Sequence, residues 1–122
     1  MLKEMIFVGL GGFCGASARY GLGQLFPPPT CGFPRTTLLI NVLGALLLAC
    51  FGVWAERVPQ LNRHLLLFLQ VGLCGGFTTF STFAVETVNL LQRGAVWMAL
   101  AYVLLSTLLC FMAVGGVYYF LR

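Results

Sequence analysis

The residues best suited to chemistry lie together in one stretch, inside a segment otherwise apolar enough to be a membrane helix. It reads Gly75-Gly76-Phe77-Thr78-Thr79-Phe80-Ser81-Thr82-Phe83. Two adjacent glycines favour a break in a helix, because glycine loses the most backbone entropy when it is ordered. In lipid, broken backbone is tolerated only where it is buried in protein or lines a water-filled cavity. A break flanked by threonine and serine therefore indicates an ion or substrate site.

The same stretch has a simpler interpretation. Small residues let two membrane helices pack closely, and serine or threonine hydroxyls often bond back to their own helix. Gly72 and Gly76 have the GxxxG spacing of such contacts. Both interpretations stay open at this point.

Four further polar residues interrupt the apolar segments. Asn41, an amide among leucine, valine and isoleucine, needs partners or water, which indicates an interhelical hydrogen bond or a pore-lining donor. Tyr102 and Ser106 are one helical turn apart and share a face. Arg19 lies near the end of the first segment, where it would either snorkel to the interface or hold an anion or carboxylate at the mouth of a water-filled cavity.

Composition predicts a single all-α integral membrane domain over residues 1–122. Of the residues, 60% are hydrophobic and only 8% are charged, whereas a soluble domain carries about a quarter charged residues. The net charge of +4 is spread along the chain and forms no patch, so nucleic-acid binding has no support. We find no nucleophile–base pair and no metal constellation, so we do not expect an enzyme.

Four transmembrane helices fit the hydropathy pattern, at about residues 5–25, 36–55, 61–91 and 95–121. The third is too long for one straight span of a hydrocarbon core about 30 Å thick. A break near residues 75–78 explains how it fits. The prolines at residues 27–29 end the first segment, since proline lacks the N–H and blocks the preceding turn.

The loop charges favour neither orientation in the membrane. Orientation follows the Lys/Arg bias of short loops. One side would hold Lys3, Arg57, Arg63 and Arg122, and the other Arg19, Arg35 and Arg93; four minus three leaves one. So small a bias lets the chain insert both ways. Four helices also cannot easily enclose an aqueous path alone, and a homodimer of two oppositely oriented copies satisfies both observations.

At these residues the sequence resembles the Fluc (CrcB) fluoride channels of bacteria. The resemblance covers the whole chain in length and segment order, and its most specific part is the core Thr78-Thr79-Phe80-Ser81-Thr82-Phe83. The other matching stretches are Gly11-Gly12 through Gly15, Arg19-Tyr20, Thr37-Leu38-Leu39-Ile40-Asn41-Val42-Leu43-Gly44, Gly72 to Phe77, and Glu86-Thr87.

The resemblance implies an antiparallel, dual-topology homodimer with two pores in the bacterial cytoplasmic (inner) membrane. Its broken third helices cross at the dimer centre, where backbone carbonyls matching Gly75 and Thr78 hold a structural sodium ion. Its activity would be passive fluoride export, which protects the cell from fluoride toxicity. The residues matching the fluoride path are Asn41, Phe80, Ser81, Thr82, Phe83, Tyr102 and Ser106.

These residue types suit fluoride, which is small, strongly hydrated and a strong hydrogen-bond acceptor. Amide and hydroxyl groups replace its water without a fixed charge that would trap it. Phenylalanine contributes because the edge of its ring is positive and attracts an anion weakly.

Two other functions fit part of the pattern. A small dual-topology multidrug or cation antiporter needs a membrane-embedded carboxylate in its first segment, which here has only Glu4, at its start. A structural membrane assembly subunit held by GxxxG contacts would not need Asn41 and a run of hydroxyls. Efflux of fluoride and chloride from loaded liposomes separates these functions.

Overall fold

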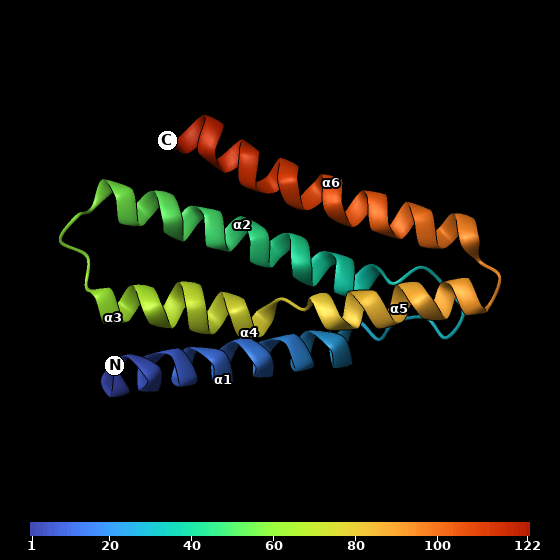
Figure 1. Cartoon of the computed structure of the whole chain (residues 1–122), viewed down its shortest axis with the longest axis horizontal. Helices are drawn as coiled ribbons and strands as arrows, with labels where there is room; N and C mark the ends of the chain where they lie inside the picture. Colours follow the sequence, from blue (N-terminus) through green and yellow to red (C-terminus); the bar gives the residue numbers. More distant parts are fainter.

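A computed structural model describes residues Met1–Arg122, which are helical almost throughout and contain no strand. The helices are α1 (Leu2–Leu25), α2 (Arg35–Arg57), α3 (Arg63–Leu66), the π-helical segment η1 (Leu67–Cys74), α4 (Gly75–Phe77), α5 (Phe80–Gln92) and α6 (Val96–Leu121). Because α3 to α5 follow one another along one line, the chain forms four long rods (Figure 1). The all-α prediction is confirmed.

Three of the rods are long and apolar enough to cross a membrane: α2, the run Arg63–Gln92, and α6. The fourth rod, α1, has 24 residues but is not among them. Its many glycines, together with Lys3, Glu4 and Arg19, lower its hydropathy. Both termini and the α2–α3 loop lie at one end of the molecule, and the other two connections lie at the opposite end (Figure 1).

Helix α1 packs against the first half of the third rod through backbone, not through large side chains. A Cβ atom placed on Gly76 would lie 2.6 Å from the carbonyl oxygen of Gly12, and one on Gly72 would lie 2.6 Å from that of Val8. Only glycine permits so close an approach. The close packing predicted from the GxxxG spacing of Gly72 and Gly76 is confirmed.

The buried core is small. Only 17 of 122 residues are buried, so one copy cannot hide its apolar surface from water by itself. One cluster of Ala49, Val53 and Val117 joins α2 to α6, and a second of Leu90, Ala99 and Tyr102 joins α5 to α6. Ile40 and Phe77 are buried outside these clusters, and many of the other large apolar side chains are exposed on the single chain.

Candidate functional site

The third rod is interrupted at two residues between α4 and α5. Thr78 (φ −77°, ψ 156°) and Thr79 (φ −149°, ψ 110°) have extended backbone. The sequence places the break near residues 75–78, but Gly75 and Gly76 themselves are helical. Gly76 serves the close approach to α1, and the change in backbone direction falls on the threonines after it.

Asn41 of α2 holds the interruption from one side. Its Oδ1 accepts a hydrogen bond from the Thr79 N–H (2.8 Å), and its Nδ2 donates to the Thr79 carbonyl (3.1 Å). One amide thus satisfies both backbone groups of an extended residue, as a neighbouring β-strand would. The interhelical bond that was one of two interpretations of Asn41 is present, and the residue also lines the hollow described below.

Arg19 of α1 holds the interruption from the other side. Its Nε donates to the carbonyl of Gly76 at 3.1 Å, and the side chain is half-buried. The sequence suggested snorkelling or contact with an anion or carboxylate; the observed partner is instead a backbone carbonyl. Helix interruptions expose such carbonyls, so the Arg19 guanidinium stabilises the interruption directly.

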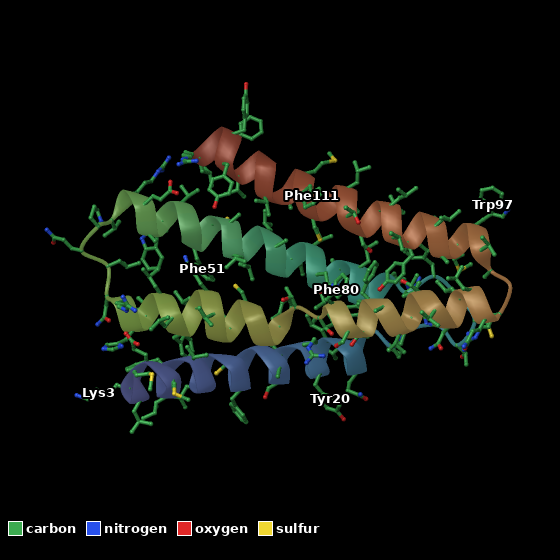
Figure 2. All side chains as sticks on the ribbon, viewed as in Figure 1. Lys3, Tyr20, Phe51, Phe80, Trp97 and Phe111 are labelled. Atoms are coloured by element: carbon green, nitrogen blue, oxygen red, sulfur yellow. The ribbon has the colours of Figure 1, made fainter.

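A hollow of about 610 Å³ lies beside the interruption. Its walls come from α2, η1, α5 and α6, with Phe80 at the start of α5 and Phe111 on α6 both contributing (labelled in Figure 2). Six of the residues predicted for the path or for the sodium ion line this one hollow, namely Asn41, Gly75, Thr78, Phe80, Phe83 and Ser106.

Among the residues that line the hollow, Ser106 has a buried hydroxyl group without a hydrogen-bond partner. Its side chain is 7% exposed, and its hydroxyl oxygen is buried without a hydrogen-bond partner. A buried hydroxyl without a partner is unfavourable, by about 1–3 kcal/mol. No group of the chain therefore uses the hydrogen-bonding capacity of this hydroxyl, although Ser106 itself lines the hollow.

The two phenylalanines differ in their surroundings. Phe80 is 79% exposed in the single chain, and its ring centroid lies 5.5 Å from that of Phe83 at an interplanar angle of 43°. Phe83 continues the contact to Tyr102, at 5.0 Å. The tilted rings of Phe80 and Phe83 belong to the same wall of the hollow.

The other predicted path residues lie away from the hollow. Tyr102 is fully buried and donates to Oε2 of Glu86 at 2.6 Å, while Thr37 donates to Oε1 of the same carboxylate at 2.8 Å. Ser81 is exposed, and Thr82 is half-buried with its hydroxyl accepting from Thr79 Oγ1 at 2.9 Å.

Sequence reasoning missed the roles of Thr79, Thr37 and Glu86. Thr79 caps α5, since its Oγ1 accepts from the Thr82 N–H at 3.2 Å. The signal was present, because threonine before a helix is a preferred N-cap. The Thr37–Glu86–Tyr102 group joins three segments that are distant in sequence, so only their packing brings it together.

Comparison with known proteins places the chain in one family. Residues 6–117 match the family model described as "CrcB-like protein, Camphor Resistance (CrcB)". The chain is 46% identical over 109 residues to a protein of Roseobacter denitrificans named fluoride-specific ion channel FluC, a match that covers 86% of this chain and 84% of that protein.

Two further relatives carry the same name. The protein of Ruminiclostridium cellulolyticum is 44% identical over 113 residues, covering 89% of this chain and 87% of the relative. That of Paracoccus denitrificans is 45% identical over 114 residues, covering 93% and 90%. By the extent of the family match and the identity of these relatives, the chain belongs to the CrcB-like protein family.

Proposed function

We propose that the protein is a fluoride-selective channel that lets fluoride leave the cell passively. The observation that carries the proposal is the hollow in which a buried, unpartnered Ser106 hydroxyl is grouped with the rings of Phe80 and Phe83 and the amide of Asn41. Relatives that share over 40% of its residues are named fluoride-specific ion channels.

The chemistry of this wall suits a small anion better than a large organic cation. A hydroxyl, an amide N–H and the positive edges of aromatic rings attract an anion, and none of them carries a full charge. Such attraction is strong enough to replace water and weak enough to release the ion, as conduction requires. A channel of this kind performs no covalent chemistry, so the protein is not an enzyme.

The conducting unit in this proposal is an antiparallel homodimer of dual topology. Its support is the open side of the hollow, where the aromatic side chain of Phe80 is exposed in the single chain. A second copy would cover the open side of the hollow and turn it into a closed path. We place this dimer in the bacterial cytoplasmic (inner) membrane as a multi-pass protein.

A structural sodium ion at the dimer centre belongs to the same proposal, with the Gly75 and Thr78 carbonyls as its ligands. Hard cations favour oxygen ligands, and interrupted helices supply them. The donor set fits: the Thr78 carbonyl accepts no hydrogen bond from the chain, and the N–H of Thr79 bonds to Asn41 and not to Gly75. When bound, the ion would supply a fixed positive charge beside the anion path.

In the cell, fluoride that enters as neutral HF ionises inside and needs a route out. A passive channel provides it, because accumulated fluoride flows down its own gradient. This role gives the resistance to cytoplasmic fluoride that we propose.

Efflux from liposomes tests the function. Vesicles containing the protein and loaded with potassium fluoride or potassium chloride are diluted into fluoride- and chloride-free buffer, and anion release is followed with electrodes after valinomycin is added. We expect fast fluoride release and chloride release close to that of empty vesicles. Equal release of both anions would refute a fluoride-selective channel.

The same assay addresses the two alternatives. Fluoride flux that requires a proton gradient, or proton-coupled uptake of an organic cation, would indicate an antiporter. No flux of any ion would favour a structural assembly subunit. Glu86, the deep carboxylate, accepts hydrogen bonds on both oxygens from Thr37 and Tyr102, which suits a structural role better than proton coupling.

A further inference from the structure

The interruption between α4 and α5 redirects backbone donors in a specific pattern. In a continuous helix, each carbonyl accepts a hydrogen bond from the N–H four residues later. The Gly75 carbonyl would then accept from the Thr79 N–H, and the Thr78 carbonyl from the Thr82 N–H. Neither bond is formed, because both donors have other partners.

The first donor, the Thr79 N–H, bonds to a side chain of another helix. The Thr79 N–H bonds to Oδ1 of Asn41 at 2.8 Å, and the Asn41 amide returns a bond to the Thr79 carbonyl. Both contacts hold Thr79 away from the helical position in which its N–H would reach Gly75. Asn41 therefore keeps the Gly75 carbonyl without its usual donor.

The second donor, the Thr82 N–H, bonds to a side chain of the same segment. The Thr82 N–H bonds to Oγ1 of Thr79 at 3.2 Å, and the same hydroxyl donates to Oγ1 of Thr82 at 2.9 Å. The Thr78 carbonyl accepts no hydrogen bond from any part of the chain. By contrast, the nearby Gly76 carbonyl is bonded by Arg19 Nε, so the pattern does not leave every carbonyl of the break open.

We propose that Asn41 and the Thr79 hydroxyl are positioning residues for the sodium ion: they divert the two donors that would otherwise occupy the Gly75 and Thr78 carbonyls. The inference rests on the sodium site of the proposed function. It assigns Thr79 a role distinct from the fluoride path, and it gives Asn41 a second role through the backbone. Without the diversion, the backbone would return toward a continuous helix and withdraw the oxygen ligands.

The test measures sodium binding and not conduction. The midpoint of thermal unfolding of the purified full-length protein is followed across a sodium chloride titration, with N-methylglucamine chloride keeping the ionic strength constant. A ligand that binds only the folded state raises this midpoint as its concentration rises. We expect the native protein to respond to sodium and not to N-methylglucamine.

Thr79→Val removes the hydroxyl and nearly keeps the shape, whereas Thr79→Ser keeps the hydroxyl and serves as the matched control. For Thr79→Val we expect the sodium concentration of half-maximal stabilisation to rise by about 10–100-fold, the usual effect of losing a group that positions metal ligands. Thr79→Ser should follow the native titration. Asn41→Leu tests the other diversion in the same way and decides the matter should Thr79→Val fail to assemble.

Two results would overturn the inference. One is an unchanged sodium titration in both Thr79→Val and Asn41→Leu. The other is an equal fall of the midpoint at every sodium concentration, which would show that Thr79 acts only as a helix cap. A native protein that conducts fluoride but does not respond to sodium would overturn the sodium site and leave the channel intact.

Discussion

Among single residues, Ser106 has the most informative surroundings. Most buried hydroxyls have partners within the protein, and those that do not require an explanation. The Ser106 hydroxyl has no hydrogen-bond partner in the chain, and the residue lines the hollow with Phe80 and Phe83. By contrast, a hydrogen bond to another group of the chain is made by each of Thr37, Thr78, Thr82, Thr87 and Thr107. A role toward a ligand explains this arrangement better than a role in stability.

Replacing Ser106 by alanine separates these two roles. Since no hydrogen bond within the chain is lost, we expect the stability of Ser106→Ala to equal or exceed that of the native protein. Fluoride flux should fall by up to about tenfold, because one net hydrogen bond is worth about 0.5–1.5 kcal/mol. Liposome efflux and thermal unfolding of the same preparation measure both. Ser17→Ala, on the exposed side of α1, is the control and should leave both unchanged; native flux in Ser106→Ala would contradict the role.

Replacing Phe80 and Phe83 distinguishes a role of their rings in fluoride conduction from a role in packing. Phe80→Ile and Phe83→Ile keep apolar bulk but lose the positive ring edge. We expect fluoride flux to fall strongly while the proposed dimer persists on size-exclusion chromatography. If the rings only pack, the changes would cost about 1–2 kcal/mol of stability and leave flux nearly intact. Phe13→Ile, at an exposed position of α1, controls for loss of an aromatic ring; near-native flux in the double variant would defeat the ring-edge idea.

At the level of elements, the site depends on how α1 and α2 pack against the third rod and hydrogen-bond to it. Glycines bring the backbone of α1 against η1 and α4, which places Arg19 at the Gly76 carbonyl. Helix α2 places Asn41 at Thr79. Gly44 of α2 lies against Thr78, since a Cβ at that position would overlap the threonine side chain. The interruption is therefore fixed by its neighbours as well as by its own sequence.

Two glycines of α1 test the importance of this contact. A Cβ on Gly11 would lie 2.9 Å from the Cα of Gly72, whereas a Cβ on Gly9 would meet nothing within 4 Å. Gly11→Ala should therefore destabilise the protein by about 1–3 kcal/mol through overpacking. Gly9→Ala, on the same helix, should be neutral or stabilising by up to about 1 kcal/mol, since alanine favours helix. Unfolding titrations in mixed micelles compare the two, and equal stabilities would contradict the close contact.

At the level of the whole molecule, the chain has too little core to account for its apolar surface. Of its residues, 17 are buried, and the hollow is bounded by one copy on only part of its circumference. Lys3 and Arg122 lie beside the termini, and Arg57 and Arg63 flank the α2–α3 loop at the same end of the molecule (Figure 1). Arg19 instead bonds the Gly76 carbonyl near the interruption. The opposite end keeps Arg35 and Arg93, so four minus two leaves a bias of two. The partly open hollow, which a second copy would close, therefore supports the proposed dimer more strongly than the charges do.

Labelling from each side of the membrane tests dual topology. The native cysteines are replaced, a single cysteine is placed in the α2–α3 loop at Asn62, and proteoliposomes are treated with a membrane-impermeant maleimide before and after permeabilisation. We expect about half of the copies to react from outside in a dimer of opposed copies. Labelling of all active protein from one side would exclude that arrangement.

The sequence by itself determined the all-helical class and the approximate place of the interruption in the chain, and it predicted the residues of the site. Apolar runs long enough to cross a bilayer leave helix as the only structure that satisfies the backbone, so three of the four rods, α2, the run Arg63–Gln92 and α6, follow from local composition. Residues 75–83 marked the interruption for the same reason, because glycine and threonine disfavour continuous helix locally.

Tertiary structure decided which groups pair at that interruption. The bond from Arg19 to Gly76, the two bonds between Asn41 and Thr79, and the Thr37–Glu86–Tyr102 group all join segments that are far apart in sequence. Spacing within a segment cannot predict them, because they depend on the separation and rotation of neighbouring helices. The glycines show the same division: sequence suggested a break at Gly75 and Gly76, but packing against α1 keeps Gly76 helical and moves the extended backbone to Thr78 and Thr79.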